Sequence, residues 1–185
     1  MQRLINRGPS KDAIFADVGG GGATGATGAA GATGAGGVTG ATGAAGAATT
    51  FSNFFALMPG DNAATVAVGA AVQFPQNGPT NGAATRLSPS TFTIAATGTY
   101  EVAWQVSVTE AGQLMVKVNA TEQASTVVGR ATGTSQLVGN TLMLLTAGDV
   151  LSIVNPSGNS TALTITPTAG GTHAVSATLS IKKLA

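Results

Sequence analysis

The residues that could carry out chemistry in this chain are few and scattered. The sequence has no cysteine, one histidine and seven acidic residues. Disulfides and thiolate metal sites are therefore excluded, and His173 has no second histidine with which to bind a metal ion. Gly19–Gly22 is as glycine-rich as a phosphate-binding loop but lacks the Gly-Lys-Ser/Thr ending of one. We expect no metal, no cofactor, no catalytic residues and no enzymatic activity.

Charge and hydropathy restrict the partners of the chain. Only 8% of its residues are charged and its net charge is +1, against about 25% charged residues in typical soluble domains. Without a basic patch to neutralise phosphates, nucleic acid is not an expected partner. No stretch approaches the roughly 20 consecutive apolar residues of a membrane span. Residues 1–18 also lack the apolar run of a secretory signal, so no recognisable signal is expected.

Glycine recurs at every third position from residue 19 to residue 46 without a miss. This register is the signature of a triple helix, in which three polyproline-II chains wind together and only glycine fits at the axis. A flexible linker would also be rich in glycine, but it would not need a glycine at every third position. We therefore predict a collagen-like Gly-x-y stalk over residues 19–50, about 90 Å long at about 3.1 Å per residue. The axial positions are Gly19, Gly22, Gly25, Gly28, Gly31, Gly34, Gly37, Gly40, Gly43 and Gly46.

The predicted stalk contains no proline, which normally lowers the entropy lost when a polyproline-II chain is ordered. Threonine stands instead at the third place of five triplets. These residues are Thr24, Thr27, Thr33, Thr39 and Thr42. Such a rod is marginal alone, so we expect another part of the chain to hold three copies in register.

Residues 51–185 show the period-2 alternation of strands that bury one face. The clearest run is Thr99–Thr109, and shorter runs cover Gln113–Asn119, Thr161–Pro167 and His173–Ile181, with His173 near a strand start. Turn signals separate about ten such strands, which predicts an all-β fold, a jelly-roll β-sandwich head that forms a homotrimer. The expected head core includes Phe92, Tyr100, Val102, Trp104, Val106 and Val108.

Two segments of the predicted head resemble a known family. Phe92–Val102 is similar to the Phe-x5-Gly-x-Tyr-x-Phe signature of TNF-like and complement globular heads, with Val102 in place of the last phenylalanine. Leu145–Ile153 resembles a late strand of the same family, in which Gly-Asp precedes an apolar alternation. This resemblance implies a trimeric jelly roll.

Four longer segments resemble the C-terminal domain of BclA-type collagen-like glycoproteins of bacterial spore surfaces. They are Phe54–Val66, Gln105–Leu114, Val128–Gln136 and Gly158–Pro167. The resemblance implies a homotrimeric filament with a globular tip, O-linked sugars on the stalk threonines, and a place in the exosporium or on a spore appendage. This stalk is much shorter than is typical of that family, and residues 1–18 do not match its proline-rich anchoring motif.

Residues 1–18 contain two apolar pairs, Leu4 with Ile5 and Ile14 with Phe15. We expect them to attach the filament to an anchoring spore-coat or appendage protein. The alternative is that residues 1–18 are a disordered tail without a partner. Two other functions fit a trimeric rod with a β head. One is a phage or viral tail-fibre-type adhesin whose head binds a host receptor, and the other is a secreted TNF-like ligand.

Overall fold

The computed structural model of the chain describes residues 28–29, 49–58, 60–62, 65–132 and 135–185. The chain divides into two compact units, Met1–Ala44 and Ala45–Ala185, and the second contains the head. Of the axial glycines only Gly28 is described; it is exposed, with open space where a Cβ would stand. The other axial glycines, the five stalk threonines and Leu4, Ile5, Ile14 and Phe15 lie outside the described residues.

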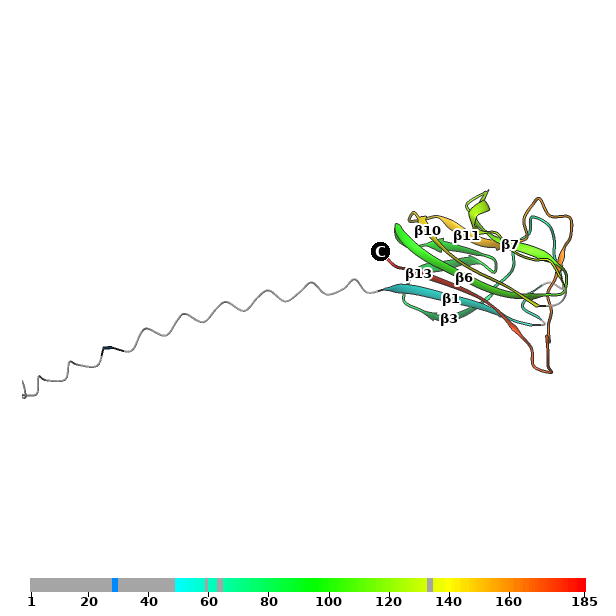
Figure 1. Ribbon diagram of the computed structural model, residues 1–185, viewed down its shortest axis with the longest axis horizontal. Helices are drawn as coiled ribbons and strands as arrows, with labels where there is room; N and C mark the ends of the chain where they lie inside the picture. Colours follow the sequence, from blue (N-terminus) through cyan, green and yellow to red (C-terminus); the bar gives the residue numbers. More distant parts are fainter. Residues whose placement is uncertain (1–27, 30–48, 59, 63–64, 133–134) are drawn as a thin grey trace, which may run out of the picture. The chain divides into compact units, whose positions relative to one another are not determined.

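The first layer of the head is a five-stranded antiparallel sheet in the order β10-β6-β13-β1-β3 (Figure 1). The 11-residue strand β6 (Gly98–Val108) forms from the run in which apolar and polar residues alternate most regularly. It pairs with β10 along its whole length and with β13 from Tyr100 to Gln105. The other members are β10 (Ser135–Leu145), β13 (Ser176–Lys183), β1 (Thr50–Leu57) and β3 (Gln76–Thr80).

The second layer is a six-stranded antiparallel sheet in the order β4-β5-β11-β7-β8, with β9 also paired to β7. Its strands are β4 (Ala84–Ser88), β5 (Thr91–Ile94), β11 (Val150–Val154), β7 (Gly112–Val118), β8 (Thr121–Glu122) and β9 (Val128–Arg130). A small pair joins β2 (Thr65–Val66) to β12 (Leu163–Thr164), and the 3-10 turn η1 covers Ala124–Thr126. The described residues thus form thirteen strands rather than about ten, because three of them, β2, β8 and β12, have two residues each.

The core lies between the two layers and contains all six residues that the alternation places there. Phe92, Tyr100, Val102, Trp104, Val106 and Val108 each expose 2% of their surface or less. Phe92 on β5 joins the layers, because its ring lies 4.3 Å from that of Phe54 on β1 and 6.3 Å from that of Phe74. No helix among the described segments is long and apolar enough to cross a membrane.

The segment from Phe92 to Val102 forms a strand, a turn and the start of a second strand. Phe92 fills the core, and Gly98 begins β6 where the chain passes against the backbone oxygen of Ala185, so that a Cβ would clash there. The Tyr100 hydroxyl donates a hydrogen bond of 2.7 Å to the Ala96 carbonyl and so fixes the turn. Burial raises the pKa of Tyr100 above its ordinary value of 10.0, so this donor stays protonated at neutral pH.

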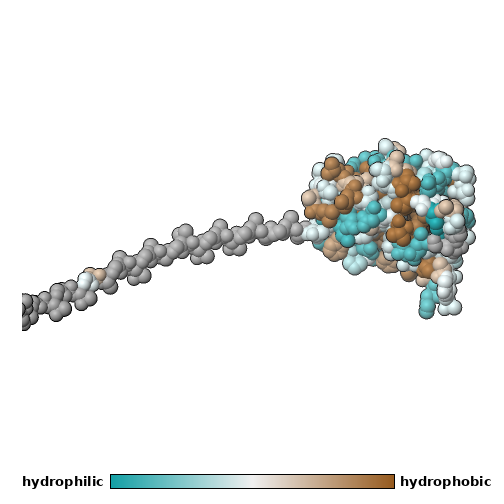
Figure 2. Space-filling view, viewed as in Figure 1, coloured by the Kyte–Doolittle hydropathy of each residue, from teal (hydrophilic) through white to brown (hydrophobic). Residues whose placement is uncertain are grey.

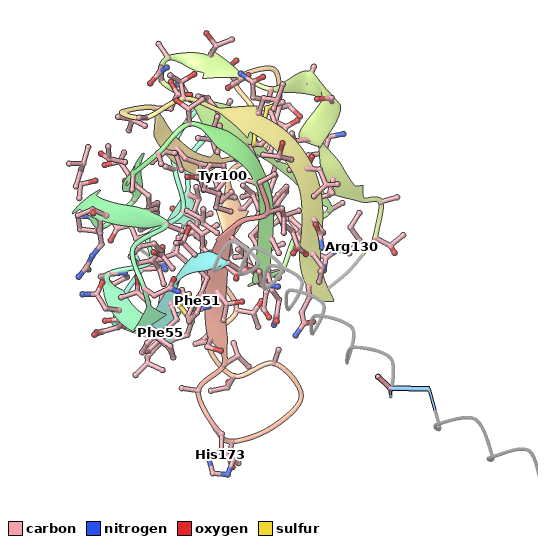
Figure 3. The ribbon with its side chains drawn as sticks, turned by 90° about the vertical axis from the view of Figure 1, so that its left-hand side faces the viewer. Phe51, Phe55, Tyr100, Arg130 and His173 are labelled. Atoms are coloured by element: carbon pink, nitrogen blue, oxygen red, sulfur yellow. The ribbon has the colours of Figure 1, made fainter. Side chains whose placement is uncertain are left out.

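Two strands are shorter than the alternation predicts. The run His173–Ile181 becomes a strand only from Ser176, so the expectation that His173 begins a strand is wrong. His173 lies instead in the exposed loop that follows Gly170 and Gly171, and Figure 3 shows it at the tip of a loop that projects from the sandwich. The run Thr161–Pro167 is reduced to β12 and a single bridge between Ile165 and Val108.

Gly139 on β10 faces the indole ring of Trp104 across the sheet, and a Cβ at this position would overlap the ring. We predict that Gly139→Ala lowers the free energy of unfolding of the head by about 1–3 kcal/mol, the usual cost of overpacking a core. Denaturation in urea measures the loss. The double variant with Trp104→Leu should recover part of it; equal losses in the single and double variants would show that the ring is not the cause.

Candidate assembly surface

The outer face of the five-stranded sheet is the part of the described head that could join it to other molecules. Side chains alternate along each strand, and directly paired residues share a face. Tyr100 and Val102 on β6 point into the core, so Glu101 between them points outward. Its register partners Leu142 on β10 and Lys182 on β13 lie on the same outer face.

The first feature of this face is a patch of exposed leucine and valine on β10, here called the β10 patch. It consists of Leu144, Leu142 and Val138, which expose 83%, 65% and 61% of their surface. Their neighbours Leu137 and Leu145 point into the core and are 2% exposed. This strand is therefore apolar on both faces, which is typical of strands that are covered on both sides.

A second apolar patch lies on the other side of the same face, on β1. It consists of Phe51, Phe55 and Leu57 and is here called the β1 patch; Leu57 is 51% and Phe51 37% exposed, and Phe55 is half-buried. Figure 3 shows the rings of Phe51 and Phe55 along the same strand. In Figure 2, hydrophobic residues gather in separate patches on the head, with hydrophilic residues between them.

A polar strip lies between the two patches: Glu101 on β6 and Lys182 on β13, joined by Asn140, which stands on β10 itself between Val138 and Leu142. Glu101 on β6 accepts a hydrogen bond of 2.8 Å from the Asn140 amide, and the Lys182 ammonium lies 3.3 Å from its other oxygen. The Asn140 hydrogen bond, followed by Lys182, holds the pKa of Glu101 below its ordinary 4.5. The strip therefore keeps its negative charge, paired with a positive one, down to acidic pH.

The lowered pKa of Glu101 has a consequence for stability. A carboxyl with a depressed pKa in the folded state stabilises the fold above its unfolded pKa, and that contribution disappears as the pH falls through the folded value. Glu101→Gln should therefore lose less stability than the wild type when the pH is lowered from 7 to below 4.5. Urea unfolding at a series of pH values measures this difference. Parallel curves for the two proteins would contradict it.

The sequence prediction missed the two apolar patches. Phe51, Phe55 and the β10 residues were not among the expected site residues, because exposed apolar residues on separate strands meet only through the strand register. One signal was available in Leu142–Leu145, a continuous apolar run that does not alternate. His173 stands at the tip of its projecting loop, and no cluster of metal-binding residues occurs within the described ranges.

A family model, the BclA C-terminal domain, matches residues 55–185 of the chain. The chain belongs to this family. The match covers almost the whole two-layered head, and it includes the four segments that resembled the family in sequence, apart from Phe54 at the start of the first. Membership in the BclA C-terminal domain family implies the head of a collagen-like glycoprotein of the exosporium, at the spore surface.

Solved structures show that this BclA C-terminal domain has the jelly-roll fold of TNF-like heads. The head is similar to murine APRIL, with 13% identity and a TM-score of 0.51, over 74% of this chain and 100% of the other. It is also similar to Eiger TNF from S. frugiperda, with 12% identity and a TM-score of 0.55, over 74% and 92% of the two chains. The globular domain of zebrafish complement 1qA gives 13% identity and a TM-score of 0.49, over 73% and 96%.

A comparison with curated proteins gives no match. The BclA C-terminal domain family and TNF-like heads are generally non-catalytic. Heads of this kind typically assemble as trimers.

Proposed function

We propose that the chain is a structural surface protein whose three copies form a collagen-like filament with a globular tip on the outer layer of a bacterial spore. One observation carries this proposal. A BclA C-terminal head, which follows a strict Gly-x-y register, presents two separate apolar patches on one sheet face. Exposed apolar side chains that gather on one face mark surfaces that become covered by a partner.

The proposed partner on this face is a second copy of the head. A closed ring of three needs a heterologous interface, in which one patch of each copy contacts a different patch of the next. The β10 patch and the β1 patch provide two such different surfaces, on opposite sides of the polar strip. Burial of their side chains supplies the driving force. The Glu101–Lys182 pair contributes specificity rather than affinity, since misregistered copies would leave its charges unpaired.

The trimeric head in turn supports the stalk. β1 begins at Thr50, the last residue of the predicted stalk 19–50. Three heads in one ring would hold three stalks together and raise their effective concentration, as a linker does between two binding modules. This would allow a proline-free triple helix, marginal alone, to form. The stalk threonines would point outward and accept O-linked sugars at Thr24, Thr27, Thr33, Thr39 and Thr42.

Attachment is assigned to residues 1–18, through the apolar pairs Leu4–Ile5 and Ile14–Phe15. The test uses spores that produce either the natural chain or a variant with all four residues changed to serine. We expect the natural chain to co-purify with the outer spore layer and the variant to be released as intact trimer. A chain that is absent from spores, or a variant that stays attached, would contradict the location or the anchor respectively.

A further inference from the structure

The head has a pocket at the end of the sandwich opposite to the start of β1. β6 runs parallel to β1 through their shared neighbour β13, so its end at Val108 lies far from Thr50. The hairpin that follows Val108 leads directly into the pocket, which has a volume of about 460 Å³. Its wall includes Gln113, Gly129, Arg130, Asn159, Ser160 and Thr161. This position is distinct from the β10 and β1 patches on the outer sheet face.

Part-buried hydrogen bonds hold the wall in one arrangement. Arg130 donates hydrogen bonds from one guanidinium nitrogen to the carbonyls of Val108, at 3.0 Å, and of Glu110, at 2.5 Å. The Glu110 carboxylate accepts bonds from the backbone N–H of Thr164, at 2.6 Å, and from its hydroxyl, at 2.5 Å. These bonds join the β6–β7 hairpin, β9 and β12. The pocket is therefore preformed, as small-molecule sites usually are.

The second side of the pocket is fixed through a buried asparagine. Asn155, which is fully buried, donates from its amide to the Thr161 carbonyl at 3.0 Å. Its side-chain oxygen accepts a bond of 2.8 Å from the amide of Asn159. The loop that carries Ser160 is thus tied to the core at both of its ends.

Within this rigid frame, several polar groups keep their hydrogen-bonding capacity for a ligand. Over the described residues, the side chains of Gln113, Ser160 and Thr161 make no hydrogen bond, although each borders the pocket. Gly129 gives Gln113 room, since a Cβ there would stand 3.0 Å from Gln113 Cγ. One amide and two hydroxyls provide both donors and acceptors at neighbouring points.

The charge of the pocket selects a neutral ligand. Arg130 is its one charged wall residue, and one of its guanidinium nitrogens already donates to the backbone carbonyls of Val108 and Glu110. We propose that this pocket binds a neutral polyhydroxyl compound, a mono- or disaccharide, through Gln113, Ser160 and Thr161. A volume near the lower end of the range for ligand pockets suits a ligand of this size.

The wall contains no aromatic residue on which a sugar ring could stack. We therefore expect weak binding, with a dissociation constant on the order of 1 mM for one head. Lectin-like function would then depend on several copies acting together on a multivalent surface. That last step alone rests on the proposed trimer, whereas binding by one head does not.

The test is saturation-transfer NMR on the full chain with methyl glucoside, methyl galactoside, methyl mannoside and N-acetylglucosamine as probes. At least one probe should give a signal that Gln113→Ala weakens about tenfold. Ser160→Trp, which fills the opening without touching the core, should abolish it. Thr85→Ala, an exposed hydroxyl on β4 outside the pocket, should leave it unchanged.

Three outcomes would overturn the proposal. They are the absence of any sugar signal, a signal that survives both pocket variants, and displacement of the bound sugar by inorganic phosphate or acetate. The last outcome would show that Arg130 makes the pocket an anion site. None of them bears on the trimer, because the solution mass of the chain is measured separately.

Discussion

Leu142→Lys converts the trimer into monomers that remain folded. Leu142 is 65% exposed on one head, and the proposed ring buries it three times, once at each interface. Burial of a leucine is worth about 1.5–3 kcal/mol, and a lysine in its place must also lose its hydration. In the monomer the new ammonium stands opposite Glu101, its register partner, which favours folding. Light scattering gives the mass of the variant, and circular dichroism shows whether it is folded.

Leu87→Lys provides a matched control. Leu87 is 62% exposed, almost the same as Leu142, but it lies on β4 of the other sheet, outside the proposed ring. We expect this variant to keep the mass of the wild type. A trimeric Leu142→Lys variant would contradict the β10 patch as an interface. Dissociation by both substitutions would show that the loss is not specific to this face.

Phe92→Ala is the substitution with the largest expected effect on the stability of the head. Phe92 on β5 of the six-stranded sheet is fully buried, and its ring lies beside those of Phe54 on β1 and Phe74 before β3, on the side of the five-stranded sheet. Truncation of a buried phenylalanine costs about 3–5 kcal/mol, a large part of the total stability of about 5–15 kcal/mol of an ordinary domain. Fluorescence of Trp104, the single tryptophan, follows unfolding in urea.

Leu87→Ala serves as the control for that experiment, because exposed positions usually change stability by no more than about 0.5 kcal/mol. All variants are compared at one protein concentration, since the stability of an oligomer depends on concentration. A loss below about 1 kcal/mol for Phe92→Ala would mean that the two layers do not depend on this aromatic cluster.

The sequence predicted the centre of the fold well because every second residue of β6 from Tyr100 to Val108 is large and apolar. Its five large apolar residues from Tyr100 to Val108 are all buried, and the strand bounds differ from the predicted run by one residue at each end. The family resemblance also pointed to the correct fold. Its TNF-like signature corresponds to the buried ring of Phe92, to Gly98 at the closely packed start of β6, and to the turn held by the hydrogen bond of the Tyr100 hydroxyl. The local alternation of apolar and polar residues is sufficient to predict a strand where one face of the sheet is buried and the other is exposed.

Features that depend on distant pairings were not predictable in this way. The two apolar patches belong to strands far apart in sequence, and only the register of β10, β6, β13 and β1 brings them to one face. The pocket depends on Arg130 and Glu110 bridging three segments, which no spacing rule reveals. The run from His173 looked like a strand start, but Ala174 and Val175 remain outside the ladder.

The central claim is that the head itself assembles three copies. Light scattering on residues 45–185, the compact unit that contains the whole sandwich, tests it most directly when compared with the full chain. We predict three copies in both. A monomeric head beside a trimeric full chain would place assembly in the stalk, and would contradict the ring built from the β10 and β1 patches.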